Sequence, residues 1–592
     1  MPEFIPQERI GVFPAPVKFA VAPSSLDYSL SGVAADFRPQ AIPLPATGWN
    51  ATRQWRDSRG YLDFGLGSWL TSTLSAGYRI VDTKKSTLGV RLQHNSTSLW
   101  KPSADMLLPS GSWQSGKETR NRLQRYDEAL GIYGAHNFDG KGTLSAAIDY
   151  HLGYFNYYGF APSHNVMGSS VPANLPNAPT QTLNDVAARV KWTSPTAVDK
   201  IRYSAYAGVR YFGYRRLYLF NGQNPYAPES LSGGRETDVN LGAAFFFPLS
   251  GKSSIGVELD SHIVGYSDFD SEGGERYDIV APDTYGTVAL TPYYRFAKER
   301  LNVKIGARID LAFNAGPEHD RFNAFHIAPQ VTVDYNAGAA TLFLHLLGGN
   351  ALHTLASGYE LDYYQTPAIF NTAPVYTPVD AKLGADFGPF SGFSAGVDFA
   401  YRFSKKQYLG GWYTAYLNND DSAIGSLPEE IAGSRAYYDY FPETRADISG
   451  VSIGVNAAYD AGRYFKVSAE GRYQPQHGKK GYFNGLDRPR WTLDARIESN
   501  PWSTLKFRLS YNYRGVRTLP VAGWSQAGDA VCSLENYRLP DLCMLNFGVA
   551  YDITSKIGVW GQVDNILNRH DDKLPCLPGQ GIILTAGLSL LF

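Results

Sequence analysis

The sequence has little cysteine, methionine and charge, and it has no long hydrophobic run. Three Cys and four Met occur in 592 residues, and charged residues make up 18%, which is low for a soluble protein. Since 54 Lys and Arg balance 55 Asp and Glu, the chain lacks the basic surplus typical of nucleic-acid binding, and no nucleic-acid partner is expected. The apolar run 341–347 is far shorter than the ~18 residues of a membrane helix. An aromatic content of 14% argues against a disordered chain.

Alternation of apolar and polar residues is the dominant signal that remains. In the segment 504–515 every second residue is apolar or aromatic, and most residues between them are charged. The same pattern recurs in 200–213, 301–313, 463–474 and 490–498. Only a β-strand, whose side chains alternate between two faces, separates such sets of residues. The chain is therefore predicted to be all-β.

The connections between the predicted strands alternate between short and long. Short turns such as 139–142 alternate with long connections such as 98–122 and 416–446. This sorting of loops, together with strands often ten to fourteen residues long, favours an outer-membrane barrel over a soluble sandwich or propeller. Counting gives about 22 strands, from 60–68 to 581–592. We predict a transmembrane antiparallel β-barrel with both termini periplasmic and long extracellular loops.

The C-terminal segment carries the most specific motif. The stretch 563–568 reads Val-Asp-Asn-Ile-Leu-Asn, and the stretch 582–592 alternates up to a terminal Phe592, the residue expected to serve as the insertion signal for the barrel-assembly machinery. This ending resembles that of TonB-dependent receptors, in which two such strands close a 22-stranded barrel. The segment 60–69 resembles the first barrel strand of the Bacteroidota branch. The resemblance implies a barrel over residues 59–592 and names no substrate.

The N-terminal segment departs from that family. Residues 1–58 contain eight prolines, which favour an extended chain over the globular plug of a TonB-dependent receptor. We expect a proline-rich periplasmic or luminal arm without a plug domain. The residues after Met1 lack the basic start and apolar core of a signal peptide, so the numbered chain is expected to be a mature or trimmed form.

The sequence offers no convincing catalytic, metal-binding or cofactor-binding set. Two His-Asp pairs, at 319–320 and 570–571, lie in predicted loops, and no Ser/His/Asp set converges by spacing. The chain is therefore not expected to be an enzyme. Neither zinc nor calcium spacing appears, and no cofactor is expected.

All three cysteines fall in or beside the last two long loops. A disulfide between Cys532 and Cys543 would close the penultimate loop, and Cys576 in the next loop could compete for either partner. Free thiols are the alternative.

The polar faces of the predicted strands are expected to line the lumen with charges of both signs. The residues singled out are Arg202, Arg210, Lys304, Arg308, Asp310, Lys466, Glu470, Arg472, Asp494, Arg496, Lys506, Arg508 and Arg514. We expect Glu470 and Arg472 to form ion pairs with the adjacent strand 490–498. Because barrels of this size are normally plugged, long loops, the arm or another protein must fill the interior.

Two functions fit this prediction. The first is a plugless, TonB-receptor-like porin for solute transport or nutrient uptake across the outer membrane. The second is a structural or assembly subunit of a larger outer-membrane complex. The expected partners are the lipid bilayer, the barrel-assembly machinery during insertion, and a surface lipoprotein or another outer-membrane barrel.

Overall fold

The structure is a computed structural model of the whole chain. It describes residues 58–102, 106–107, 113–114, 120–156, 180–195, 201–219, 229–249, 252–267, 284–315, 322–361, 374–407, 412–413, 446–462, 464–478, 489–524, 532–569, 572–574, 577–578 and 580–592. The predicted arm, apart from residue 58, and the predicted loop 416–446, apart from residue 446, lie outside these residues, so their expected roles stay predictions.

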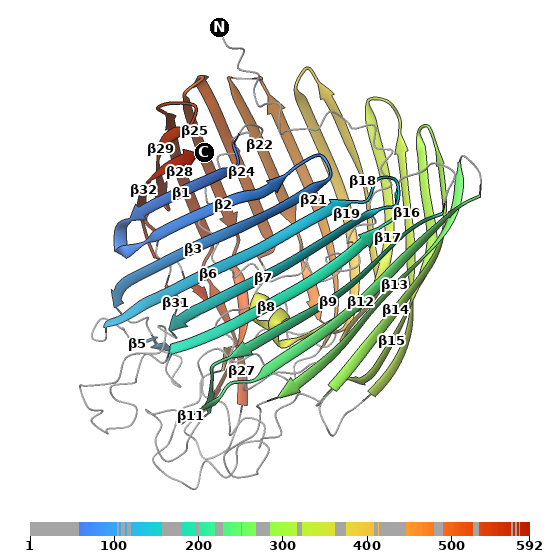
Figure 1. Cartoon of the computed structure of the whole chain (residues 1–592). Coiled ribbons are helices and arrows are strands. Elements are labelled where there is room, and N and C mark those ends of the chain that lie inside the picture. Colours follow the sequence, from blue (N-terminus) through green and yellow to red (C-terminus); the bar gives the residue numbers. More distant parts are fainter. Residues whose placement is uncertain are drawn as a thin grey trace.

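One closed antiparallel sheet forms the barrel (Figure 1). Its 23 segments make 22 strands, because β22 and β23 both pair with β21 and form one interrupted strand. In order around the barrel these are β1 (Gly60–Gly67), β2 (Ser72–Asp82), β3 (Ser86–Pro102), β6 (Arg120–Asn137), β7 (Thr143–Asn156), β8 (Thr180–Thr193), β9 (Arg202–Tyr214), β12 (Arg235–Pro248), β13 (Ser253–Ser267), β14 (Thr284–Lys298), β15 (Leu301–Ala315), β16 (Phe322–Asn336), β17 (Ala340–Ala351), β18 (Val375–Phe390), β19 (Phe393–Gln407), β21 (Ala446–Asp460), β22 (Phe465–Tyr473) with β23 (Gln476–Gly478), β24 (Trp491–Trp502), β25 (Leu505–Arg514), β28 (Leu542–Asp552), β29 (Ile557–Asp564) and β32 (Ile583–Leu591). The predicted strand number is confirmed.

Shorter elements lie in the connections. These are β4 (Met106–Leu107), β5 (Trp113–Gln114), β10 (Arg216–Leu219), β11 (Glu229–Ser232), β20 (Trp412–Tyr413), β26 (Arg517–Trp524), β27 (Cys532–Leu539), β30 (Asp572–Leu574), β31 (Leu577–Pro578), the 3₁₀ turn η1 (Ser68–Leu70) and the helix α3 (Leu355–Leu361). No helix in the described part of the chain is long and apolar enough to span a membrane.

The first and last strands close the barrel. The Gly60 N–H donates to the Phe592 carbonyl at 2.8 Å, and the Phe592 N–H donates back to the Gly60 carbonyl at 3.1 Å. A Cβ on Gly60 would lie 2.4 Å from the Phe592 ring, so glycine is what lets the C-terminal ring lie over β1. Because the strand number is even, the start of β1 and the end of β32 meet at the rim that carries the short turns (Figure 1).

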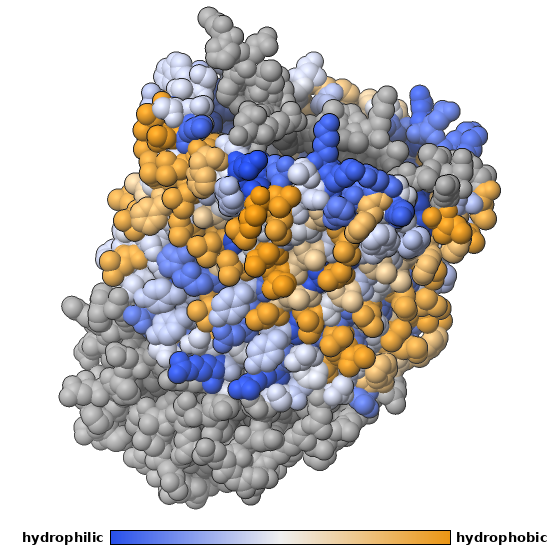
Figure 2. Space-filling view, in the orientation of Figure 1, coloured by the Kyte–Doolittle hydropathy of each residue, from blue (hydrophilic) through white to orange (hydrophobic). Residues whose placement is uncertain are grey.

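The two faces of the wall separate by side-chain type. In β9 the outward residues include Tyr203 and Val209, each 42% exposed, whereas Arg210 and the fully buried Phe212 point inward. Figure 2 shows apolar side chains spread over the outer surface of the strands. A closed sheet satisfies every backbone hydrogen-bonding group internally, as a lipid environment requires of strands. An apolar outer surface is the second feature of strands that face lipid.

Candidate functional site

A segment that follows β17 folds into the barrel interior. We call residues 352–361, which include α3, the inner segment. It begins just after Gly349, whose φ of +136° favours glycine and whose Cβ would lie 2.6 Å from the Arg308 side chain. The strand register also shifts between Leu347 and Gly349, so β17 bends at its end. The bend directs the chain inward, where α3 contacts β9 and β12 (Figure 1).

The inner segment is tied to the wall where it enters the interior. The Tyr285 hydroxyl of β14 donates to the His353 carbonyl at 3.0 Å. Tyr285 is fully buried and forms a small cluster with Val264 and Ala312, against which Leu352 packs. The start of the segment is therefore held by both a hydrogen bond and apolar contact.

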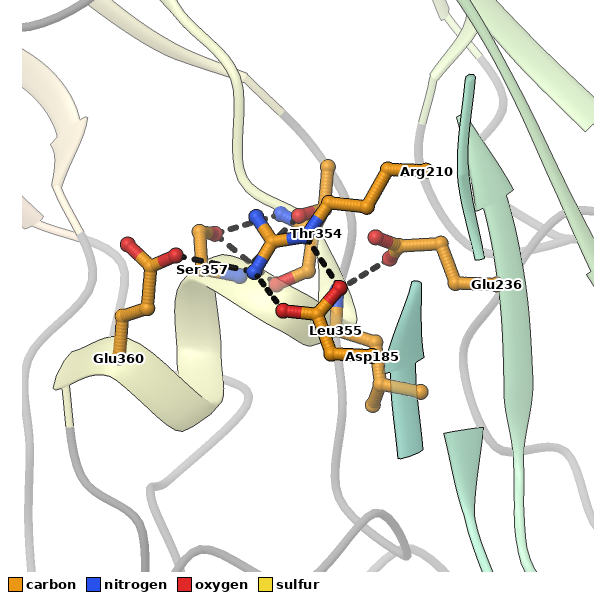
Figure 3. A network of polar contacts seen from close by, with 7 residues as sticks. All are labelled: Asp185, Arg210, Glu236, Thr354, Leu355, Ser357 and Glu360. Atoms are coloured by element: carbon orange, nitrogen blue, oxygen red, sulfur yellow. Dashed lines mark hydrogen bonds and ion pairs between the residues drawn. The ribbon is translucent and has the colours of Figure 1, made fainter. Parts of the chain in front are cut away.

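Reciprocal hydrogen bonds define the start of α3 (Figure 3). The Ser357 N–H donates to Thr354 Oγ1 at 3.1 Å, and the Thr354 N–H donates to Ser357 Oγ at 2.7 Å. This is a capping box in which Ser takes the place of the usual Glu or Gln. The Leu355 N–H donates to Glu236 Oε2 at 2.5 Å, so a carboxylate from β12 satisfies a further free amide of the helix start.

Arg210 joins three elements through its guanidinium (Figure 3). Its Nε and Nη2 donate to the two carboxylate oxygens of Asp185 on β8 at 2.9 and 2.8 Å. Nη2 also donates to Glu360 Oε1 on α3 at 3.1 Å. A two-point pair of this kind fixes the guanidinium plane, so the end of the helix is held in a defined position on β9.

Aromatic contacts complete the attachment. The Tyr359 ring lies 5.6 Å from Phe212 and 6.3 Å from Tyr214, both on β9, and 6.4 Å from His151 on β7. The first residues of α3, Leu355 and Ala356, are almost fully buried. The inner segment therefore rests on the part of the wall from β7 to β14, which lies three to eight strands before its own strand β17 in the sheet order.

A second polar cluster lies on the same wall. His262 on β13 contacts Asp238 through Nδ1 at 3.0 Å and Asp260 through Nε2 at 3.5 Å. The Tyr206 hydroxyl donates to Asp260, and the Arg189 guanidinium lies 4.1 Å above the Tyr206 ring. These charges pair with one another, so the wall presents both signs to water without a strong net field.

The structure places the predicted lumen residues on the face opposite to the apolar one, mostly in contact with a partner. The contacts are Arg202 over the Phe246 ring, Arg210 with Asp185, Lys304 with Glu258, Arg308 with Asp310, Lys466 with Asp460, Glu470 with Arg472, Arg472 with Asp398, Asp494 with Arg514, Arg496 with Glu498, Lys506 with Asp552, and Arg508 with Glu498. That these side chains line a conducting pore stays a prediction.

The ion pairs expected between β22 and β24 are not the ones that Glu470 and Arg472 make in the structure. The register sets Glu470 opposite Asp494, two residues of the same charge. Arg472 reaches Asp398 on β19 at 3.0 Å instead, and Asp494 accepts from Arg514 on β25 at 3.0 Å. Alternation alone gives the face of each residue, whereas ion pairing depends on register.

Cys543 is a free thiol in this structure, and the Tyr511 hydroxyl lies 3.7 Å from its sulfur. The side chains of Cys532 and Cys576 lie outside the described residues. Their pairing stays a prediction. Among the described residues no group of three His, Cys, Asp or Glu side chains could hold a metal ion.

No protein-family model matches the sequence, and no curated protein matches it. Solved structures do match it. The FrpB iron transporter from Neisseria meningitidis (F3-3 variant) has a TM-score of 0.63 at 11% identity, over 90% of this chain and 81% of that chain. The siderophore receptor PirA from Acinetobacter baumannii has a TM-score of 0.64 at 12% identity, over 90% and 80%. The ferripyoverdine receptor of the outer membrane of Pseudomonas aeruginosa has a TM-score of 0.59 at 11% identity, over 90% and 72%.

These likenesses concern the fold. At 11–12% identity they show a shared barrel and carry no substrate or residue role over to this chain. The chain has the 22-strand barrel fold of TonB-dependent receptors.

Proposed function

We propose that this chain is an outer-membrane barrel that acts in solute transport or nutrient uptake. The observation that carries the proposal is the closed barrel with an apolar exterior and a charged interior, in the fold of iron transporters and siderophore receptors. A wall of paired charges suits the passage of hydrated solutes. The transport proposal requires no chemical step.

The proposed location is the bacterial outer membrane. The lipid bilayer would surround the apolar face, the short turns and both termini would lie in the periplasm, and the long connections would lie outside the cell. Iron chelates are the first solutes to test, because two of the structurally similar proteins are the FrpB iron transporter and the siderophore receptor PirA.

The position of the inner segment inside the barrel supports the proposal that the passage for solutes is narrowed there. Of the fillings expected for so wide a barrel, a loop that folds inward is the one supported by residues 352–361. Its capping box, its ion pair and its aromatic contacts hold it on the wall without help from another chain.

Single-channel conductance in planar bilayers tests the transport proposal. We expect the wild-type barrel to conduct, and a variant whose residues 353–361 are replaced by a short Gly-Ser linker to conduct several times more. The control is a linker of equal length in the exposed turn 337–339. If neither barrel conducts and neither admits iron chelates into vesicles, the transport proposal is wrong.

The second candidate is a structural subunit of an outer-membrane complex. Purification in mild detergent distinguishes the two functions. Stoichiometric recovery of another barrel would favour the structural role, whereas recovery of a nutrient-capturing surface lipoprotein would favour uptake.

A further inference from the structure

Ser72, His94 and Glu128 meet on the outer face of the barrel wall, where Ser96 Oγ also lies 2.6 Å from Ser72 Oγ. Ser72 Oγ on β2 lies 2.8 Å from His94 Nε2 on β3, and His94 Nδ1 is hydrogen-bonded to Glu128 Oε1 on β6. Because an ionised carboxylate only accepts, the Nδ1–H faces Glu128 and Nε2 is left to accept from the Ser72 hydroxyl. Ser, His and Glu are thus connected in the order that activates a serine nucleophile.

The sheet register places this set on the outside. Glu128 lies directly opposite His94, and His94 lies directly opposite Leu74. Ser72 lies opposite Leu66, which is 57% exposed on the apolar exterior. The interior is lined by the alternate residues, such as Asp127. The set therefore faces away from the lumen and from the inner segment.

An acid and a base on this surface call for an explanation. Toward the short turn, the outward residues of β3 that precede His94 are Leu88, Val90 and Leu92. A carboxylate facing lipid is unfavourable, and ionisable groups at such places are commonly functional. The histidine and carboxylate side chains are 26% and 38% exposed, so they remain reachable.

The set lies near the end of the wall that carries the long connections. Ser72 is the first residue of β2 and follows η1, in which Trp69 and Leu70 both have positive φ, 61° and 51°. Backbone strain at residues other than glycine is often found beside functional groups. Leu70 is 72% exposed there. In the outer-membrane orientation proposed above, this position would lie at the boundary between acyl chains and headgroups, where the ester bonds of lipids lie.

We propose that Ser72, His94 and Glu128 form a lipid-facing acyl-ester hydrolase site. Ser72 Oγ attacks the carbonyl carbon of an O-acyl ester, and its proton passes to His94 Nε2. The ester C–O bond then breaks, the proton passes from His94 to the leaving alkoxide, and the acyl group stays on Ser72. Water attacks the acyl-serine with His94 taking its proton, and a fatty acid leaves as the proton returns to Ser72. Glu128 is a positioning residue that holds the imidazole.

The substrate class follows from the surroundings of the site. Leu66 and Leu70 flank Ser72 with exposed aliphatic surface suited to acyl chains. The shared chemistry is an O-acyl ester of a membrane lipid, present in glycerophospholipid and in lipid A. The inference uses the membrane location proposed above and is independent of transport.

Fatty-acid release by the purified full-length barrel tests the site. The protein is supplied with phosphatidylethanolamine vesicles in one arm and with lipid A in the other, and labelling by a fluorophosphonate probe is measured in parallel. We expect release from one or both lipids and probe labelling, each reduced about 10³-fold or more by Ser72→Ala and by His94→Ala.

The matched control is Ser261→Ala. Ser261 is also an outward serine on a barrel strand, but its hydroxyl donates to the Leu241 carbonyl at 3.1 Å. This variant should release fatty acid at the wild-type rate. If the folded wild type releases no more fatty acid than Ser72→Ala and takes up no probe, the three side chains only link strands and the proposal is wrong. Conductance of the same preparations keeps this result separate from transport.

The role of Glu128 has its own measurement. Glu128→Gln should slow release about 10²-fold and change its pH profile, and Glu128→Asp should restore part of the rate. A purely structural carboxylate would leave the pH profile of the remaining activity unchanged.

Discussion

Arg210 shows how a single side chain can connect elements that lie far apart in the sequence. It is 25 residues from Asp185 and 150 residues from Glu360, and it bonds to both. Its side chain is partly exposed to the barrel interior, so each contact is weaker than it would be in a dry core. The value of the pair lies in geometry, because the forked guanidinium holds the end of α3 in one place.

Replacing Arg210 by Ala should loosen the inner segment. Loss of hydrogen bonds to two carboxylates is expected to weaken its attachment by about 2 kcal/mol, or roughly 30-fold in the opening equilibrium. Hydrogen–deuterium exchange of a peptide that covers 352–361 should accelerate accordingly. Arg91→Ala is the control, because Arg91 also faces the interior but pairs with Asp149. Unchanged exchange in Arg210→Ala would mean that the aromatic contacts suffice.

At the scale of elements, the bend at the end of β17 decides where the next segment goes. Gly349 adopts a conformation that is strained for other residues, and its missing side chain makes room for Arg308. Arg308 in turn donates to Asp310 at 2.9 Å, and Asp310 accepts from the Asn350 N–H at 3.1 Å. The bend at Gly349 therefore leaves the space that the buried Arg308–Asp310 ion pair occupies, and Asp310 in turn accepts a hydrogen bond from the backbone just after the bend.

Gly349→Ala should destabilise the barrel. The strained φ and the close approach to Arg308 are expected to lower the free energy of unfolding by about 2 kcal/mol. Urea unfolding, followed by tryptophan fluorescence, measures the change. Gly471→Ala is the matched control, because its Cβ would meet nothing closer than 3.9 Å and the substitution should be nearly neutral. Equal midpoints for the two variants would contradict the argument.

The sequence allowed the strands to be predicted but not the sites. Strong alternation, as in 504–515, gives both the existence of a strand and the face of each residue. The helix α3 has only seven residues, too few for an amphipathic repeat that the sequence could reveal. Ser72, His94 and Glu128 lie 22 and 34 residues apart, and only the register of three strands brings them together. A period-two pattern excludes a register slip of one residue but not a slip of two, so it does not fix which residues lie opposite one another.

At the scale of the whole molecule, closure depends on the contact between the two chain ends of the barrel. The Phe592 ring is largely exposed and lies 6.2 Å from the Tyr78 ring. Its backbone, rather than its ring, makes the hydrogen bonds that join β32 to β1. The ring is therefore available for recognition during assembly without being essential for the closed state.

Phe592→Ala should separate assembly from stability. We expect much less folded protein in the outer membrane of cells, because the predicted insertion signal is lost. After refolding in detergent, the free energy of unfolding of Phe592→Ala should differ from that of the wild type by less than about 0.5 kcal/mol, as expected for an exposed side chain. Leu588→Ala, at another outward position of the same strand, serves as the control for lost apolar surface. Normal amounts of Phe592→Ala in the membrane would contradict the assigned signal.

The wall of the barrel differs in height around its circumference. β6 has 18 residues and β3 has 17, whereas β1 has 8. About 9–11 tilted residues are enough to cross the hydrocarbon region. The surplus of roughly 7 residues in β6, at about 3.4 Å per residue and a tilt near 45°, would stand about 17 Å above the bilayer. On one side of the cell-surface opening, the strands of the barrel would therefore form a rigid raised rim. Antibodies and other large soluble proteins could reach this rim.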